Sequence, residues 1–370
     1  MTSIRRKWHV KSRNGCDTCK MRKIKCDELH PECWNCIKKG LRCNFKPLRP
    51  MAVKEPPDIE LEHLEHLELL HHFTISTAST LANESEIRDL WRVWVPQIAL
   101  SVRYVLEGIL ALAALHKARY NPERRESLEA RAMEYHNASL ARALPLVTHP
   151  NRHNGAHLFL FGVLTLLFSL AKPRTADDIF LVGSGVVPEW LYLLRGIDTV
   201  IEAESAIEAS PISLIFRATN PSFEYWRSHE PVEHGALTAL KANIRARAQA
   251  SNQKTLLDAV EALQRSFTIR SRDTLQFQHK MRGFYTWLYD ISDEYLKLLR
   301  QGDCEALCVL AFYSVLLKDL ERHWWLEGWA VHLLQRIYLL LDEEHQLWIR
   351  WPVEEVGWVP PCVPSVSYQT

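Results

Sequence analysis

The chain has 370 residues, of which 47% are hydrophobic and 24% charged, a composition typical of a soluble globular protein. Its net charge of +1 conceals an asymmetry, because residues 1–46 carry +9 and the rest of the chain carries −8. No apolar stretch follows the first basic residues, and the longest apolar run, residues 158–171, is too short to span a bilayer. We therefore expect no signal peptide and no membrane partner, but an intracellular protein whose basic head binds a polyanion.

Residues 1–14 form a basic arm, and residues 15–46 form a module with six of the nine cysteines of the chain. The pattern C-x2-C-x6-C occurs twice in this module, because each cysteine of the first copy has an equivalent 17 residues later. A short loop with Pro31 joins the two copies. Clustered cysteines in an intracellular protein favour metal binding over disulfide formation.

Two tetrahedral zinc ions need eight sulfur contacts, which six thiolates supply if two cysteines at equivalent positions each bind both ions. A disulfide knot conflicts with the expected compartment, and a single-ion site built from the two C-x2-C pairs leaves Cys26 and Cys43 unexplained. We therefore predict a small module that two zinc ions stabilise, since it is too small for an apolar core. The predicted metal ligands are Cys16, Cys19, Cys26, Cys33, Cys36 and Cys43.

Each C-x2-C pair is expected to open a short helix, and basic residues follow both pairs. Two zinc ions and six thiolates sum to −2, so part of this positive charge compensates the cluster. The excess is available for phosphates, although a merely solvated run of charge is the alternative interpretation. The basic residues are Lys20, Arg22, Lys23 and Lys25 after the first pair, and Lys38, Lys39 and Arg42 after the second.

The run CKMRKIKC, Asp27 after the third cysteine and Pro31 make residues 16–43 similar to the fungal binuclear zinc-cluster DNA-binding domain. The resemblance implies that Cys16 and Cys33 bridge two zinc ions, and that the end of the first helix contacts CGG-like triplets in the major groove. It places Arg22 and Lys23 at base-reading positions, where they would donate to guanine O6 and N7. The expected phosphate contacts are Lys20 and Lys25, with Arg5, Arg6, Lys7, Lys11 and Arg13 of the arm.

Residues 47–58 contain four prolines and predict an extended linker. Residues 59–370 predict an all-α regulatory domain, because glycine is scarce and no series of alternating strands appears. Leucines in the segment 61–73 recur every three residues over fewer than two heptads, which favours a helix docked on the body over a zipper. Its histidines are expected on the exposed side, and a homodimer is left open without a clear coiled coil. Further helices are expected over residues 108–120, over 124–144 before Pro145, over 156–171 with Asn154 as N-cap, and in the region 307–341.

The arm RRKWHVKSRNGC and the segments LELLHHF, LALAALH and WLYLLRG resemble the sterol uptake control regulators. The resemblance implies a helical ligand-sensing and activation domain whose pocket accepts a sterol. We therefore expect a sterol or another small lipid as a ligand, and the transcription machinery as a partner. The region 321–341, with Trp324, Trp325 and Trp329, is interpreted as ordinary core. Cys304 and Cys308 are interpreted as buried free thiols without further ligands, and Cys362 has no assigned role.

These features predict a nuclear, sequence-specific RNA polymerase II regulator with a binuclear zinc-cluster module and a mainly α-helical C-terminal domain. Residues 5–7 of the arm would also serve nuclear import. An enzyme with an accessory zinc module is the first alternative, but no Gly-rich phosphate loop, G-x-S-x-G or H-E-x-x-H occurs. The second alternative is a zinc-dependent protein-interaction module, which does not require the basic excess.

Overall fold

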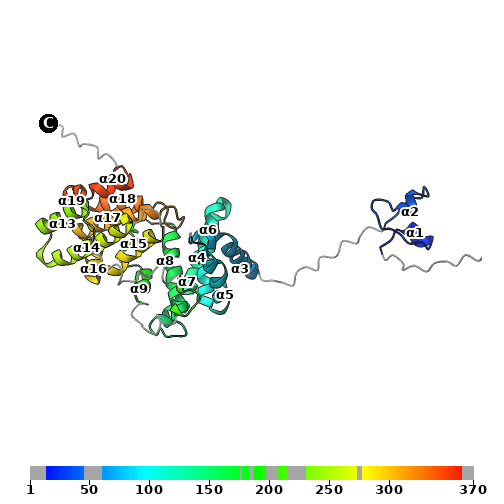
Figure 1. The fold of residues 1–370 in the computed structure, drawn as a ribbon, viewed down its shortest axis with the longest axis horizontal. Helices are drawn as coiled ribbons and strands as arrows, with labels where there is room; N and C mark the ends of the chain where they lie inside the picture. The colour runs from blue at the N-terminus through cyan, green and yellow to red at the C-terminus, as the bar shows by residue number, and fades with distance from the viewer. Residues whose placement is uncertain are drawn as a thin grey trace, which may run out of the picture. The chain divides into compact units, whose positions relative to one another are not determined.

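The structure, a computed structural model, describes residues 14–45, 61–82, 84–175, 177–182, 187–196, 207–214, 231–272 and 277–360. The chain divides into two compact units, Met1–Leu64 and Glu65–Thr370. Every regular element in the described ranges is helical, which confirms the predicted fold class (Figure 1). The arm residues 1–13, the predicted linker 47–58 and Cys362 lie outside the described residues.

The first unit contains two short helices, α1 (Asp17–Met21) and α2 (Trp34–Ile37). Cysteine side chains form its interior, and the partly buried Ile24 and Phe45 pack against them. Such a core buries too little apolar surface to hold a fold by itself. The module therefore depends on whatever binds its sulfur atoms.

The second unit is built from helices and short 3-10 or π segments. Figure 1 labels its main helices. In chain order they are α3 (Leu61–His72), η1 (Phe73–Thr77), η2 (Ala78–Thr80), α4 (Ser85–Asp89), η3 (Leu90–Trp94), α5 (Val95–Ser101), α6 (Arg103–Tyr120), η4 (Pro122–Arg124), α7 (Arg125–Val147), α8 (Gly155–Ala171), α9 (Glu189–Gly196), α13 (Gly235–Arg247), α14 (Ala250–Arg272), α15 (Phe277–Asp290), α16 (Asp293–Arg300), α17 (Cys304–Leu320), α18 (Trp329–Leu340), α19 (Glu343–Trp348) and α20 (Arg350–Val356).

Two buried helices organise this unit. α6 packs against α5, α7 and α8, and Gly108 allows α8 to approach closely, because a Cβ at this position would lie 3.0 Å from Leu164 Cδ1. α17 packs against α14, α15, α16, α18, α19 and α20. The indole N–H of Trp329 at the start of α18 donates to the Leu170 carbonyl of α8 at 2.8 Å, which links the two groups of helices. No helix within the described residues combines the length and apolarity that a membrane span requires.

The helix α3 docks on the body, as predicted, but through only part of the expected series of side chains. Leu69 and Phe73 are buried, whereas Leu64 and Leu67 are exposed. The prediction that the histidines are exposed was wrong for His66 and His72, which are both partly buried, and Nε2 of His72 lies 3.2 Å from Nδ1 of a histidine in α6. The contact comes from a residue 44 positions later, which the local spacing of α3 does not reveal.

The predicted end of one helix was wrong, whereas the helical region near the C-terminus was predicted correctly. α7 continues through Pro145 to Val147, because a proline in the last turn removes little of the helical hydrogen bonding. The helices expected in the region 307–341 are α17 and α18, and the chain turns between them before Gly328, whose φ is 75°. Trp325 and Trp329 are buried, as expected of core residues, and Trp329 also borders a pocket of the body.

Candidate metal centre and nucleic-acid interface

Both helices of the first unit begin at the first cysteine of a C-x2-C pair. Cys16 is the N-cap of α1, and its sulfur accepts a hydrogen bond from the Cys19 backbone N–H at 3.4 Å. Cys33 holds the same position before α2. The backbone N–H of Cys16 donates to the sulfur of Cys26 at 3.5 Å, and that of Cys33 donates to the sulfur of Cys43 at 3.2 Å. The sequence repeat is therefore also a structural repeat.

The six sulfur atoms form two groups of four that have two members in common. Neighbouring sulfur atoms lie 3.6–3.7 Å apart, which is too far for a disulfide. A tetrahedral zinc ion with Zn–S bonds of about 2.3 Å holds its sulfur ligands about 3.8 Å apart. The cysteines are thus positioned for two zinc ions. The groups are Cys16, Cys19, Cys26 and Cys33, and Cys16, Cys33, Cys36 and Cys43.

Hydrogen bonding distinguishes the two cysteines that the groups share. Burial acts to raise the pKa of Cys16 and Cys33, but hydrogen bonds, first from the N–H groups of Cys19 and Cys36, outweigh it and lower both pKa values. Burial and neighbouring thiols raise the pKa of Cys36 to about 12 and also raise the pKa of Cys19. Full ionisation of the cluster therefore requires a cation, which zinc ions would supply.

Reciprocal hydrogen bonds hold the two copies of the repeat together. The Thr18 hydroxyl donates to the carbonyl of Arg42 at 2.7 Å. At the equivalent positions of the other copy, the Asn35 side-chain amide donates to the carbonyl of Lys25 at 2.8 Å. Both bonds join one copy of the repeat to the other, so they hold the two halves of the cysteine module together.

The two copies differ where each helix ends. After α1 and after α2 the chain makes the same turn, in which two N–H groups donate to carbonyls three and five residues earlier at 3.0–3.1 Å. This Schellman turn puts one residue in the left-handed region, which glycine adopts without strain. That residue is Gly40 with φ 60° in the second copy, but Lys23 with φ 56° in the first. Lysine thus occupies a strained position that a symmetric frame would give to glycine.

The basic side chains of the described module are all exposed, in keeping with a surface that faces a polyanion. Arg22 is the C-cap of α1 and directly precedes the strained Lys23. The exposed residues are Lys20, Arg22, Lys23, Lys25, Lys38, Lys39 and Arg42. The predicted contacts Arg5, Arg6, Lys7, Lys11 and Arg13 lie outside the described residues.

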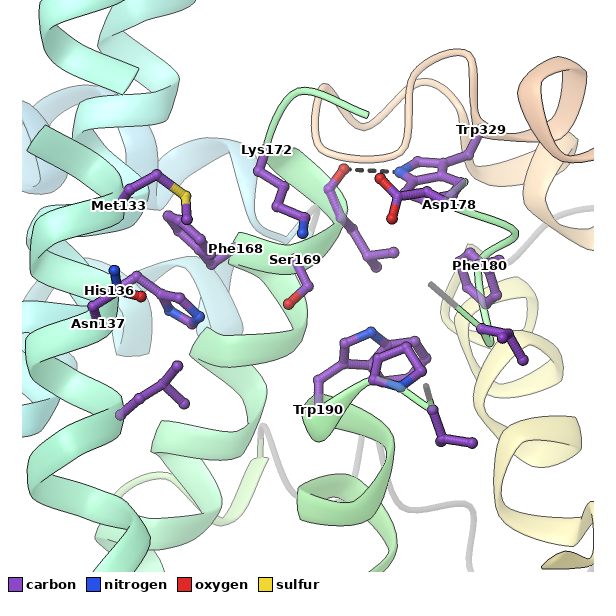
Figure 2. A pocket seen from close by; sticks show the side chains of 15 residues that line it. Met133, His136, Asn137, Phe168, Ser169, Lys172, Asp178, Phe180, Trp190 and Trp329 are labelled. Carbon is purple, nitrogen blue, oxygen red and sulfur yellow. Dashed lines mark hydrogen bonds between the residues drawn. The ribbon is translucent and has the colours of Figure 1, made fainter. Parts of the chain in front are cut away.

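The helical body contains a pocket of about 440 Å³ between α7, α8, α9 and the start of α18. Ten of its fifteen lining side chains are apolar, and Figure 2 shows Phe168, Phe180, Trp190 and Trp329 around it. Lys172 supplies a cationic group at the same pocket. A pocket of this size is typical of small-molecule sites, and its accessible lining is polar and apolar in about equal parts.

Two residues of this pocket are unusual, one in its pKa and the other in its backbone conformation. His136 stacks on Phe168 with ring centroids 3.9 Å apart, and burial, together with Lys172, lowers its pKa to about 4, so it is neutral at physiological pH. Phe180 has a φ of 64° and contacts the rings of Trp190 and Trp329 at 5.7 and 5.4 Å. Strain of this kind is concentrated at functional sites. The lining comes from distant segments, which is why the sequence did not reveal the pocket.

Comparison with known proteins identifies both parts of the chain. Residues 14–51 match the fungal Zn(2)-Cys(6) binuclear cluster domain, and residues 68–213 match the fungal specific transcription factor domain. A Zn(2)-C6 fungal-type transcription factor of Gibberella zeae is 26% identical over 436 aligned residues, covering 94% of this chain and 86% of that protein. The Zn(2)-C6 fungal-type transcription factor afumD of Aspergillus fumigatus is 31% identical, covering 54% of this chain and 56% of that protein.

A third relative shares the cluster region. Sterol uptake control protein 2 of Candida albicans is 48% identical over 62 residues, covering 14% of this chain and 9% of that protein. These matches agree with the cysteine geometry and with the all-helical body. The chain therefore contains a fungal Zn(2)-Cys(6) binuclear cluster domain followed by a fungal specific transcription factor domain, and this combination supports a DNA-binding transcription regulator.

Proposed function

We propose that this protein is a nuclear RNA polymerase II regulator that reads CGG-like sites in the major groove. Its six module cysteines would bind two zinc ions, with Cys16 and Cys33 bound to both. Arg22 and Lys23 would donate to guanine, while the other basic residues of the module and the arm 1–14 would bind phosphates. The linker 47–58 would connect this module to a regulatory body that recruits the transcription machinery. No part of this scheme requires an enzymatic activity.

The observation that carries the DNA-reading proposal is the contrast between Lys23 and Gly40. Both occupy the left-handed position of the same turn, and only glycine does so without strain. A folding requirement alone would favour glycine in both copies. Lysine in the first copy therefore supports a role for its side chain, and Arg22 lies directly beside it at the end of α1.

Selection of binding sites from random duplexes tests the proposal. The full chain should enrich CGG-like triplets, and Arg22→Ala or Lys23→Ala should relax the preference within the triplet at a cost of about 1–3 kcal/mol. Lys39→Ala is the matched control, because Lys39 is the equivalent of Arg22 in the second copy. Unchanged preference in both variants would reject the assigned role, and failure to enrich any sequence would reject the proposal as a whole.

We also propose that the body senses a sterol or another small lipid in the pocket beside α8. The support is the pocket itself, which combines the rings of Phe168, Trp190 and Trp329 with the ammonium group of Lys172. Apolar rings suit a flat hydrocarbon body, and Lys172 suits a polar head group. The strained backbone of Phe180 lies in the same wall.

Tryptophan fluorescence is the direct measurement, because Trp190 and Trp329 line the pocket. Titration of the full chain with ergosterol and a panel of other lipids should change the emission saturably. Ser169→Phe, which fills the pocket, should abolish that response without affecting DNA binding. No response across the panel would reject the sensing proposal and leave the DNA-reading proposal intact.

A further inference from the structure

A second pocket of about 320 Å³ lies beside the lipid pocket proposed above, with which it shares Leu170 and Lys172. Its lining comes from α6, α7, the end of α8 and the segment before α18. Charged residues make up six of its eleven lining residues, and its three arginines outnumber its two carboxylates even when Lys172 is left out. The pocket is therefore positive, although residues 47–370 carry a net charge of −8.

Arg174 is fixed in this pocket by a backbone carbonyl and an aromatic ring. Its Nη1 donates to the carbonyl of Glu327 at 2.6 Å, and its guanidinium carbon lies 5.3 Å from the ring centre of Trp329. A Cβ at Gly328 would lie 3.0 Å from Nη2 of Arg174, so a glycine at this position leaves room for the guanidinium. Neither contact neutralises the guanidinium, because a carbonyl and an aromatic ring carry no net charge.

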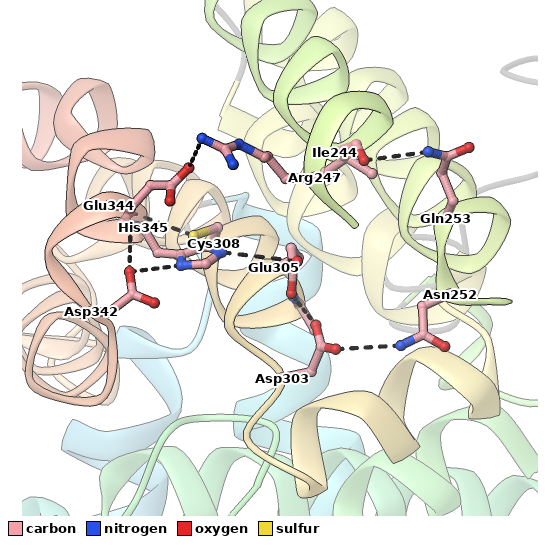
Figure 3. Close-up of polar contacts among 11 residues, drawn as sticks. Ile244, Arg247, Asn252, Gln253, Asp303, Glu305, Cys308, Asp342, Glu344 and His345 are labelled. Atoms are coloured by element: carbon pink, nitrogen blue, oxygen red, sulfur yellow. Dashed lines mark hydrogen bonds and ion pairs between the residues drawn. The ribbon is translucent and has the colours of Figure 1, made fainter. Parts of the chain in front are cut away.

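Other arginines of the helical body pair with carboxylates. Arg247 pairs with Glu344 at 3.0 Å (Figure 3). Arg124 pairs with a glutamate of α3 at 3.0 Å, which raises the pKa of Arg124. Within the ranges that the structure describes, Arg174 forms no such ion pair, and neither does Arg125, which lines the same pocket. Both guanidinium groups are therefore available to an anion.

The carboxylates near Arg174 are engaged by other groups. Glu327 pairs with Arg119, which also lines the pocket. Oδ2 of Asp178 accepts a backbone N–H at 2.8 Å, and Oε2 of Glu321 pairs with a lysine at 2.9 Å. Burial lowers the pKa of Arg174, and Glu321 and Asp178 offset this effect only in part. An anion in the pocket would stabilise the charged form of this guanidinium.

We propose that this second pocket binds a small organic anion through its carboxylate or phosphate group. Arg174 would donate to that group, because a guanidinium forms two parallel hydrogen bonds with the oxygens of either. Its fixed position lowers the entropic cost of binding, and Arg125 would add a second positive charge. The rest of the ligand would lie against Leu115 and Trp324, which supply apolar lining. The ligand is of a different class from a sterol, so the proposal does not depend on lipid sensing.

Calorimetric titration of the full chain with succinate and with glycerol phosphate tests this site, and uncharged glycerol is the control probe. At least one of the two anions should bind saturably. Its affinity should fall by about ten-fold or more in Arg174→Gln and in Arg125→Gln, as expected for the loss of one charge-assisted hydrogen bond. Arg124→Gln is the matched control variant, because Arg124 adjoins Arg125 in the chain but does not line the pocket. Its affinity for the anions should equal that of the wild type.

The outcomes identify the class of ligand or overturn the proposal. Tighter binding of succinate supports a carboxylate ligand, and tighter binding of glycerol phosphate supports a phosphate ligand. The absence of saturable binding of either anion overturns the site, and so does an equal loss in Arg124→Gln, which would indicate general attraction to a positive surface. A parallel loss of affinity for duplex DNA in both pocket variants would assign these cations to DNA phosphates and also overturn it. If Arg174→Gln does not fold, Arg125→Gln decides, because the Arg125 side chain forms no ion pair or hydrogen bond within the described ranges.

Discussion

Arg22 and Lys23 end the first helix of the cysteine module, and Lys39 and Gly40 occupy the equivalent positions after the second helix. The backbone is the same in both places, down to the left-handed residue of the turn. The exposed faces differ, because α2 presents Trp34 where α1 has an aspartate. Metal coordination thus demands symmetry of the frame, whereas the side chains that point away from the sulfurs are free to diverge. We infer that only the first half reads bases.

Loss of a shared cysteine should have the largest effect. Cys16→Ser removes a ligand from both proposed ions, so the zinc content should fall by two and DNA binding should be lost, because folding and metal binding are coupled. Cys26→Ser removes a ligand from one ion only and should leave at least one. Cys33→Ser should match Cys16→Ser if the repeat is symmetric. If Cys16→Ser retained two cluster ions, the proposal that Cys16 binds both ions would be contradicted.

The two halves should differ next in how their cations affect DNA binding. Arg22→Ala should cost about 1–3 kcal/mol on a CGG-like duplex and much less on a duplex with one changed base. Lys39→Ala should weaken both duplexes alike and lower the salt slope by about one, as expected for a phosphate contact. Fluorescence anisotropy at several salt concentrations measures both. Equal losses on the two duplexes for Arg22→Ala would remove the distinction between the halves.

Substitutions at the left-handed position should have opposite effects on stability. Lys23→Gly relieves strain and should tighten zinc binding in a chelator competition by about 1 kcal/mol, roughly five-fold, although base preference is lost. Gly40→Ala introduces the same strain and should weaken zinc binding by about 1–2 kcal/mol. Zinc binding that weakens in Lys23→Gly would show that lysine serves the fold rather than DNA.

Much of the module could be predicted from sequence because its constraints are local and repeated. The 17-residue offset pairs each cysteine with its equivalent, and the same offset pairs Lys23 with Gly40. The pairing of Lys23 with Gly40 is visible in the sequence, but the strain at Lys23 depends on its φ angle, which the sequence does not give. The strained turn therefore became interpretable only with the structure.

In the helical body, the helices could be predicted from the sequence but the contacts between them could not. Helical segments follow from composition and periodicity, but contacts between them depend on packing across long separations. Trp190 and Trp329 line one pocket although they are far apart in the sequence, and His345 lies near Cys304 although a further helix separates them along the chain. A single sequence carries no signal for such pairings, since each residue alone is compatible with ordinary core or surface.

The smallest effects should come from the hydrogen bonds that cross between the copies. Thr18→Ala removes the bond to the Arg42 carbonyl, and Asn35→Ala removes the bond to the Lys25 carbonyl. Each should weaken zinc binding by about 1 kcal/mol, the usual net contribution of one hydrogen bond. Chelator competition with both single variants and the double variant measures these losses of zinc-binding free energy.

Symmetry makes this prediction informative despite its size. If the frame is equivalent in both halves, the two single losses should agree within about 0.5 kcal/mol, and their sum should match the double variant. A much larger loss in one variant would show that one half supports the shared sulfurs more than the other. The difference between the halves would then extend from their exposed side chains into the coordination frame itself, and it would not be confined to the turn at Lys23.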